Sequence, residues 1–292
     1  MAQHQVAARP ARSLLATLPR QVRPPAAAGG EVVVLLEGRV CVVSGAGPGL
    51  GRQVALAFAR HGAAVVLSAR RPAVLEEIAA EVEAAGGRAL VVPADVTDKA
   101  QCEHLASTAA AELGGVDVVV NNVFAVDVFK TFRRVDLDDW RQLVEVNLFG
   151  PLQVSQAAIP HLQARGGGSI VFVNSMAIRK PRAQEGGYTV AKGALLTAAR
   201  QMALELGRHG IRVNSVLPGW MWGPQVQEYV RFLAGHRGVE EQAVIDEITA
   251  PIALGTIPTD EEVAGSVVYL ASDLSRSVTG QAIDVNGGEV FD

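Results

Sequence analysis

The sequence predicts an α/β protein with one doubly wound parallel sheet of about seven strands between two helical layers. Short apolar segments alternate with longer stretches of helical periodicity along most of the chain. The apolar segments lack alternating polar positions, which indicates strands buried on both faces and therefore parallel. Glycine or proline stands at many of the joints between segments, where it ends or begins a helix.

The elements follow one another in strand–helix order. The candidate strands are residues 39–44, 63–68, 89–92, 116–120, 169–174, 211–216 and 281–285. Helical periodicity covers 51–61, 72–85, 98–113, 138–165 and 188–209. Within 138–165 we expect Pro151 and Pro160 to kink or end the helix, because proline lacks the N–H that an inner turn needs. No internal repeat is visible.

The chain divides into an extension, residues 1–35, and a dinucleotide-binding and catalytic domain, residues 36–292. The extension is rich in arginine and proline and has no acid in residues 1–30. An organelle-targeting segment has such a composition. A disordered extension, or translation from an upstream start codon, is favoured because a proline-rich segment buries too little surface to fold. Residues 222–250 interrupt the strand–helix rhythm, and we interpret them as a helical cover over a substrate site.

Composition excludes several functional classes. A formal net charge of −4 indicates neither a nucleic-acid partner nor an acidic-membrane partner. No apolar run approaches the roughly 20 residues of a membrane span. Cys41 and Cys102 are far apart and outside metal-ligand spacing, and the histidines form no i, i+4 pair. We therefore expect a reduced, cytoplasmic protein without a metal site.

A glycine-rich turn follows the first strand: Ser44-Gly45-Ala46-Gly47-Pro48-Gly49-Leu50-Gly51. Glycine allows a sharp turn and a close approach of backbone to a pyrophosphate, and the next helix presents free N–H groups to the phosphates. A glycine-rich turn alone also suits an ordinary strand-to-helix loop. Its place after the first strand of an alternating pattern favours a dinucleotide and a Rossmann-type domain.

Tyr188 and Lys192 form a Tyr-x-x-x-Lys pattern at the start of a predicted helix, which puts both side chains on one face. Tyrosine titrates near pH ~10, and a neighbouring cation lowers that pKa, so the pair suits acid–base catalysis. Taken alone, the pattern also fits a surface helix. Ser175, at the end of the fifth strand, adds a hydroxyl that can hold a substrate oxygen, although it also suits a turn cap.

These motifs together resemble the short-chain dehydrogenase/reductase family from about Glu37 to Asp292. The family has Gly-x-x-x-Gly-x-Gly after a Thr or Ser, here Ser44, in place of the commoner Gly-x-Gly-x-x-Gly. The resemblance implies a catalytic set of Asn147, Ser175, Tyr188 and Lys192. It also implies that Asn147 holds a backbone kink and a water that relays protons to Lys192.

The resemblance extends to the dinucleotide site. It implies that Asp95-Val96 contacts adenine and that Pro218-Gly219 forms the nicotinamide turn, while Asn121-Asn122 follows the fourth strand. It further implies a homotetramer or homodimer built through the long helices. The expected cofactor-binding residues are Ser44, Gly45, Gly47, Gly49, Leu50, Gly51, Arg70, Asp95, Val96, Asn121, Tyr188, Lys192, Pro218 and Gly219.

Two departures from the family pattern concern the substrate. Phe124 stands where the family usually has glycine after the fourth strand. Trp220-Met221-Trp222 follows Pro218-Gly219, where a threonine often bonds the nicotinamide amide. These side chains suit an apolar wall and a hydrophobic substrate, and plain core packing explains them about as well.

The end of the second strand, Leu67-Ser68-Ala69-Arg70-Arg71, indicates the cofactor. An acid here would bond the adenosine ribose and select NAD, and none is present. Arg70 instead offers a planar, charged donor set for a 2′-phosphate, with Arg71 as a second donor or a solvated charge. We therefore expect NADP, with NAD as the alternative if Arg70 only stacks on adenine.

The sequence thus predicts an oxidoreductase that moves a hydride between NADP(H) and a ketone or secondary alcohol. An NAD-dependent alcohol dehydrogenase of the same family is the first alternative. A non-catalytic dinucleotide sensor is disfavoured because all four catalytic positions are filled. Sugar epimerases have a different glycine spacing, and enoyl reductases of related fold separate the tyrosine and lysine more widely than Tyr188 and Lys192.

Overall fold

The computed structural model describes residues 33–291. Its seven strands form one parallel sheet in the order β3-β2-β1-β4-β5-β6-β7, which confirms the predicted doubly wound architecture. Most of the extension predicted for residues 1–35 lies outside the described residues, as does Asp292. The strands are β1 Val40–Ser44, β2 Ala64–Ser68, β3 Arg88–Val91, β4 Val118–Asn121, β5 Gly168–Val173, β6 Ile211–Pro218 and β7 Ala282–Val285.

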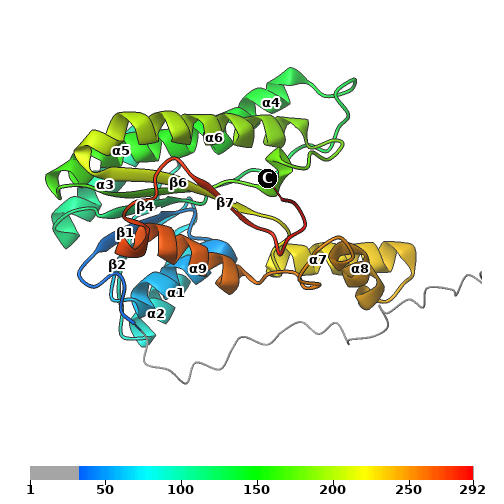
Figure 1. The fold of residues 1–292 in the computed structure, drawn as a ribbon, viewed down its shortest axis with the longest axis horizontal. Coiled ribbons are helices and arrows are strands. Elements are labelled where there is room, and N and C mark those ends of the chain that lie inside the picture. Colours follow the sequence, from blue (N-terminus) through cyan, green and yellow to red (C-terminus); the bar gives the residue numbers. More distant parts are fainter. Residues whose placement is uncertain (1–32, 292) are drawn as a thin grey trace, which may run out of the picture.

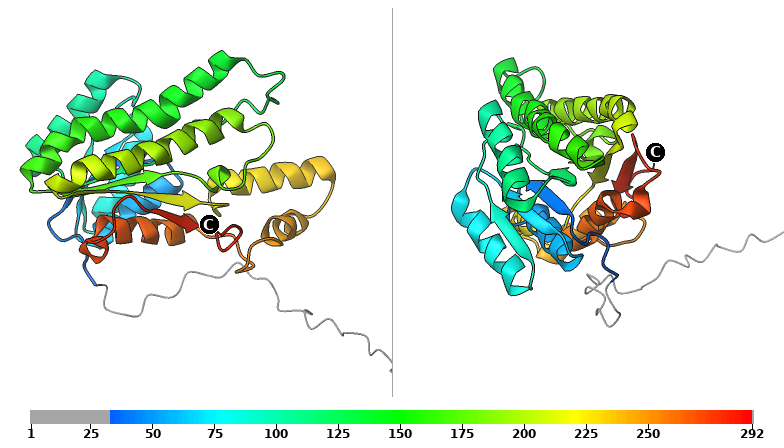
Figure 2. Two further views of the ribbon diagram at one scale, coloured as in Figure 1. Left: turned by 45° about the horizontal axis from the view of Figure 1, so that its top comes forward. Right: turned by 90° about the vertical axis from the view of Figure 1, so that its left-hand side faces the viewer.

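Helices cover both faces of this sheet (Figures 1 and 2). One layer contains α3, α5 and α6, with α4 beyond the end of α6, and the other contains α1, α2 and α9. Their bounds are α1 Leu50–Arg60, α2 Pro72–Ala84, α3 Lys99–Leu113, α4 Leu137–Val144, α5 Gly150–Ala164, α6 Gly186–Leu206 and α9 Asp260–Ala271.

Each central strand is apolar on both sides because it separates two cores. In β1, Cys41 and Val43 pack into the cluster formed with α1, α2 and α9. Val40 and Val42 pack into the opposite cluster, which contains side chains of α3, α5 and α6. The absence of polar alternation in the sequence therefore has a direct structural cause.

The chain reverses its winding direction between β1 and β4, which are neighbours although β2 and β3 lie between them in sequence. Ser44 at the end of β1 is in register with Asn121 at the end of β4. In open parallel sheets, ligands bind in the crevice outside the carboxyl ends of strands at such a reversal. The fold therefore places the candidate site at this edge.

The predicted helix 138–165 is divided by a π-helical turn, Glu145–Phe149, between α4 and α5. The two prolines do not cause this break, contrary to our expectation. Pro151 lies in the first turn of α5, where its missing N–H costs little, and α5 continues past Pro160 to Ala164. The irregular turn contains Asn147, the residue that the family resemblance associates with a backbone kink.

Helix α9 was not predicted. It packs along α1, and side chains such as Val263, Val267 and Leu270 are fully buried. Because most of its circumference is apolar, the segment has no clear one-sided stripe to identify a helix. Its start did carry a signal, since Thr259 and Glu262 form a capping box with reciprocal side-chain and backbone hydrogen bonds.

Two helices, α7 Pro224–Arg237 and α8 Glu241–Thr249, occupy the segment that we interpreted as a cover. They extend beyond the carboxyl edge of the sheet (Figure 1) and share a small apolar cluster of their own, which includes Val230, Val244 and Ile248. Among residues 33–291, no helix has the length and apolar composition that crossing a membrane requires.

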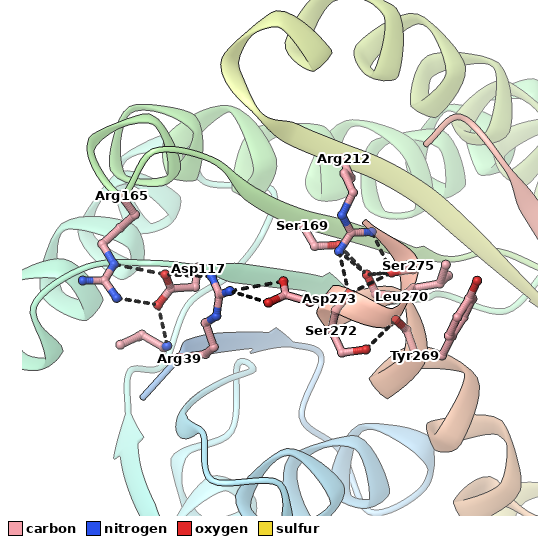
Figure 3. A network of polar contacts seen from close by, with 11 residues as sticks. Arg39, Asp117, Arg165, Ser169, Arg212, Tyr269, Leu270, Ser272, Asp273 and Ser275 are labelled. Atoms are coloured by element: carbon pink, nitrogen blue, oxygen red, sulfur yellow. Dashed lines mark hydrogen bonds and ion pairs between the residues drawn. The ribbon is translucent and has the colours of Figure 1, made fainter. Parts of the chain in front are cut away.

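The opposite edge of the sheet is held by a polar network (Figure 3). Buried Asp117 accepts a 2.8 Å hydrogen bond from the Val40 amide and a 3.0 Å bond from Nε of Arg165. Arg39 lies 3.8 Å from the same carboxylate and also pairs with Asp273. These contacts join the amino ends of β1 and β4 to the segment after α9, far from the carboxyl edge.

Candidate active site

A cavity of about 860 Å³ opens at the carboxyl edge of the sheet. It brings together most of the residues that the sequence selected. Those lining it are Gly45, Gly47, Gly49, Leu50, Gly51, Arg70, Asp95, Val96, Ser175, Tyr188, Lys192, Pro218 and Gly219. Three selected residues, Ser44, Asn121 and Asn147, are buried behind the wall.

The glycine turn forms one end of the cavity, and two of its glycines cannot be replaced without conflict. Gly45 has φ +89°, and a Cβ there would lie 2.6 Å from the Val123 nitrogen. A Cβ on Gly51 would lie 2.3 Å from the Gly45 carbonyl oxygen. Nδ2 of Asn122 donates a 2.8 Å hydrogen bond to that same oxygen, which fixes the turn to the end of β4.

This end of the cavity fits a dinucleotide. Helix α1 begins at Leu50, and its N-cap Gly49 offers no side chain to the first-turn N–H groups. Residues Gly47 to Gly51 all line the cavity, so the amino end of the helix is open to a ligand. Free N–H groups and the helix dipole favour an anion such as a pyrophosphate.

Farther along the same wall, Arg70 follows β2 and Asp95 follows β3. Asp95 accepts hydrogen bonds from the Thr97 amide and hydroxyl, and these bonds lower the pKa of its carboxyl. The charge of Arg70 lowers that pKa further, so the two side chains lie in the same electrostatic neighbourhood. The end of β2 therefore presents the Arg70 guanidinium to the cavity, and the segment of residues 67–71 contains no acidic residue.

Ser175 and Tyr188 meet at the other end of the cavity. Ser175 follows β5 and caps a short 3₁₀ turn, Met176–Ile178, by accepting a 3.1 Å hydrogen bond from the Ala177 amide. Its hydroxyl is also hydrogen-bonded to the Tyr188 side chain at the start of α6. The Ser175 hydroxyl can therefore cap the turn and still hold a substrate oxygen next to Tyr188.

Lys192 lies one helical turn after Tyr188 and is fully buried. Its Nζ donates a 2.8 Å hydrogen bond to the Val173 carbonyl and lies 5.8 Å from the centroid of the Tyr188 ring. Burial lowers the pKa of this amine to about 7, since an ammonium loses its hydration in the interior. Near neutral pH the lysine is thus poised between its charged and neutral forms.

Burial also raises the pKa of Tyr188 above its ordinary value. The hydrogen bond with Ser175 opposes this shift, and the charge of Glu185 adds to it. We expected a neighbouring cation to lower the tyrosine pKa. In the structure burial has the largest effect on that pKa and raises it, so Tyr188 keeps its proton at neutral pH.

Asn147 acts through the backbone of the loop after β4. Its Oδ1 accepts a 3.0 Å hydrogen bond from the Ala125 amide, and its Nδ2 donates a 3.0 Å bond to the Ala125 carbonyl. Ala125 itself lines the cavity. The π-helical turn therefore holds this wall in place through Asn147.

Sequence reasoning missed several residues that shape the site. Buried Asp127 accepts a 2.9 Å hydrogen bond from the Tyr188 amide and so anchors the first turn of α6. No local pattern reveals this bond, because the partners lie far apart in sequence. Asn121, which we expected to bind the cofactor, donates a 2.9 Å hydrogen bond to Ser155 on α5. Its neighbour Asn122 lines the cavity in its place.

Asp260 is the third missed residue, because α9 was not predicted. It begins α9, lines the cavity and is buried, which raises the pKa of its carboxyl. Its Oδ2 atom lies against Gly49 and Gly223, where added Cβ atoms would be 3.3 Å and 2.1 Å away. A carboxyl group therefore stands beside the amino end of α1.

Metal ligation has no geometric support within the described part of the chain. Residues 33–291 contain no group of three or more His, Cys, Asp or Glu side chains placed to hold an ion. The titratable groups at the substrate end are instead a tyrosine and a lysine next to a serine, which suits proton transfer to an oxygen.

Comparison with known proteins identifies the family. A family model described as enoyl-(acyl carrier protein) reductase matches residues 45–289, which is most of the chain. The chain is also 34% identical over 264 residues to short-chain reductase protein NovJ of Streptomyces niveus, which covers 90% of this chain and 98% of that protein. The chain belongs to the short-chain dehydrogenase/reductase family.

Two further relatives of this short-chain dehydrogenase/reductase each match most of the chain. L-rhamnose 1-dehydrogenase (NAD(P)⁺) of a Sphingomonas species is 34% identical and covers 87% of this chain and 97% of its own length. The structure of 7α-hydroxysteroid dehydrogenase with NADH and 7-oxo glycochenodeoxycholic acid matches with a TM-score of 0.79 and 28% identity, covering 89% and 97%. The protein is accordingly an NAD(P)-dependent oxidoreductase acting on CH–OH or C=O groups.

Proposed function

We propose that this enzyme interconverts an apolar ketone and the corresponding secondary alcohol with NADP(H). The observation that carries the proposal is the meeting of Ser175, Tyr188 and Lys192 in one cavity with the glycine turn. The turn fits a pyrophosphate, and the three side chains fit a carbonyl oxygen that gains or loses a proton. A bound nicotinamide supplies the hydride for reduction and accepts it for oxidation.

Each side chain has a separate role in this proposal. During reduction the Tyr188 hydroxyl donates its proton to the substrate oxygen, and during oxidation the tyrosinate accepts it. The Ser175 hydroxyl holds the same oxygen. Lys192, when charged, favours the tyrosinate and binds the cofactor ribose, and Asn147 holds the loop wall and a water that returns protons to Lys192. The contacts that hold these groups support the assignment: Ser175 bonds Tyr188, Lys192 donates to the Val173 carbonyl, and Asn147 accepts from the Ala125 amide.

The substrate end of the cavity favours an apolar molecule. Phe124, Trp220, Met221 and Val226 line it, and Phe124 is 43% exposed at the loop after β4. Helices α7 and α8 cover this end in our proposal. The direct test is a panel of ketones of increasing size, followed by nicotinamide absorbance. Faster turnover of small polar ketones than of bulky apolar ones would contradict the apolar assignment.

Reduction of a conjugated C=C bond is the second candidate, because the matching family model is described as an enoyl-(acyl carrier protein) reductase. We favour the carbonyl reaction since Tyr188 and Lys192 are one helical turn apart, with Ser175 bonded to the tyrosine. This arrangement delivers a proton to an oxygen held at the Ser175–Tyr188 pair.

A solution homodimer or homotetramer through α5 and α6 is also part of the proposal. Exposed Phe149 beside α5 and exposed Leu204 on α6 support it.

The preference for NADP rests on Arg70. This side chain lines the cavity at the end of β2, where an acid would otherwise select NAD. A guanidinium pairs with a phosphate through two parallel hydrogen bonds, whereas it gains much less from a ribose hydroxyl. We therefore expect kcat/KM to be at least about tenfold higher with NADPH than with NADH, since one charge-assisted contact contributes roughly 1.5–3 kcal/mol.

Arg70→Ala is expected to erase most of that preference by weakening NADPH use and leaving NADH use nearly unchanged. Arg88→Ala is the matched control, because Arg88 is an exposed arginine on β3 that does not line the cavity. Comparing kcat/KM for both cofactors on one ketone gives the answer. Equal use of the two cofactors by the unmodified enzyme would refute the charge argument and leave Arg70 stacking on adenine.

A further inference from the structure

The loop of residues 179–185, between the Ser175 turn and α6, carries three cationic side chains with different surroundings. Arg179 pairs with Asp284 of β7, and Lys180 pairs with Glu289 near the carboxyl terminus. Arg182 differs from both, since no carboxylate of residues 33–291 lies within ion-pair distance of it. Its guanidinium carbon lies 4.3 Å from the centroid of the Trp220 ring.

Trp220 connects this arginine to the cavity. The residue lines the cavity after β6, and its ring stacks on Tyr229 of α7 with centroids 5.6 Å apart. Arg182 itself is only half-buried. Arg182 does not itself line the cavity, so its guanidinium lies just outside it, against the Trp220 ring.

The charges around the cavity are distributed unevenly. Apart from Lys192 beside Tyr188, the side chains on the substrate side of its wall, including Phe124, Met221 and Val226, are uncharged. Of the two lining carboxylates, Asp95 belongs to the dinucleotide end, and Asp260 lies between Gly49 of that end and Gly223 at the start of α7. Glu185 lies close enough to Tyr188 for its charge to raise the tyrosine pKa, after the larger effect of burial. A cation just outside an apolar chamber, in contact with its Trp220 wall, favours an anion that lies away from the carbonyl.

We propose that Arg182 binds a carboxylate of the substrate, so that the enzyme acts on an apolar keto acid whose acid group lies far from its carbonyl. This proposal rests on the proposed ketone chemistry. The planar guanidinium offers two parallel N–H donors to a carboxylate. The indole ring of Trp220 holds the face of the guanidinium, and the N–H groups at the edge stay available to the ligand. The acid group stays at the rim and the apolar body fills the chamber.

A purely structural role for Arg182 predicts a different behaviour. If the arginine only packs on Trp220 and joins the loop to the cover, its loss disturbs every substrate equally. If it binds a carboxylate, its loss affects acids and spares neutral analogues of the same shape. The distinction therefore requires matched pairs of substrates that differ in charge alone.

The test uses linear methyl ketones CH₃–CO–(CH₂)ₙ–COO⁻ of increasing n, each paired with its primary amide, and NADPH. For the unmodified enzyme we expect kcat/KM to peak at one chain length and to favour the acid at least about tenfold there, the scale of a charge-assisted hydrogen bond. Arg182→Gln should lower kcat/KM for the acid by about the same factor and change the amide less than about threefold.

Two further variants complete the design. Arg182→Lys keeps the charge without the paired donors and should restore part of the preference. Arg231→Gln removes an exposed charge from α7, and we expect it to leave the preference intact. Equal turnover of acids and amides by the unmodified enzyme, or an equal loss on both in Arg182→Gln, would overturn the proposal. If the enzyme reduces the amides but not the acids, the ketone chemistry holds and carboxylate binding by Arg182 is refuted. If it reduces neither series, the ketone chemistry is refuted as well.

Discussion

Tyr188→Phe is expected to lower kcat/KM for ketone reduction by at least ~100-fold, the usual contribution of a positioned general acid. The phenyl ring fills the same buried space at the start of α6, so only the proton and the hydrogen bond with Ser175 are lost. Binding of the dinucleotide should be nearly unchanged, because the glycine turn and the amino end of α1 are untouched.

Steady-state kinetics on the best ketone, with NADPH binding followed by fluorescence, measures both effects. Tyr229→Phe is the matched control: it removes a tyrosine hydroxyl beside the cavity wall, on the ring that stacks with Trp220. We expect that control to stay within about threefold of the unmodified enzyme. Near-normal turnover by Tyr188→Phe would show that another group supplies the proton.

The same tyrosine sets the direction of the pH dependence. Its pKa is raised, mainly by burial, so the hydroxyl is protonated at neutral pH and ready to donate. Ketone reduction should therefore hold at neutral pH and fall as the pH rises through the tyrosine pKa. Alcohol oxidation needs the tyrosinate and should rise over that range.

Gly51→Ala is expected to have the second-largest effect, through the shape of the dinucleotide turn. Its Cβ would lie 2.3 Å from the Gly45 carbonyl oxygen and 2.9 Å from Cα of Ala46, and backbone atoms cannot yield as a flexible side chain would. The turn must therefore move relative to α1. We expect a loss of about 1–3 kcal/mol in stability, and a fall of about 100-fold in kcat/KM from misplacement of the cofactor.

Gly47→Ala provides the comparison within the same turn, since the only atom near its added Cβ is the Gly45 carbonyl oxygen, 4.0 Å away. The melting temperature without cofactor should therefore stay unchanged in Gly47→Ala and fall in Gly51→Ala. Calorimetry with and without NADPH separates folding from binding. A Gly51→Ala protein with normal stability and normal NADPH affinity would contradict the close packing that we describe between Gly51 and the backbone of Gly45 and Ala46.

The fold was predictable because its central strands are buried on both faces and several of its helices, such as α3 and α7, end at glycine. Short apolar segments identified all seven strands to within a few residues, and periodic apolar spacing identified most of the helices. It did not identify α9, whose buried faces leave no polar stripe. We also expected Pro151 and Pro160 to kink or end the helix over 138–165, but a π-helical turn, Glu145–Phe149, divides it. In both cases tertiary packing decides the local structure.

The candidate site was predictable where function depends on closely spaced residues. The glycine turn and the Tyr188–Lys192 pair are local patterns, and the structure places both on one cavity. Contacts between distant segments left no such pattern. The bond from the Tyr188 amide to Asp127 and the approach of Arg182 to Trp220 depend on loops that only the folded chain brings together. The direction of the tyrosine pKa shift likewise required its burial.

The central claim is that the enzyme moves a hydride between the nicotinamide and a carbonyl carbon. The most direct measurement supplies NADPH deuterated at C4, with each face labelled in turn, and an apolar substrate that contains both a ketone and a conjugated C=C bond. Mass spectrometry and NMR then locate the label in the product. We predict deuterium on the carbinol carbon from one labelled face only, with the double bond intact. Deuterium on a newly saturated carbon beside an intact ketone would contradict the claim and assign the enzyme to enoyl reduction.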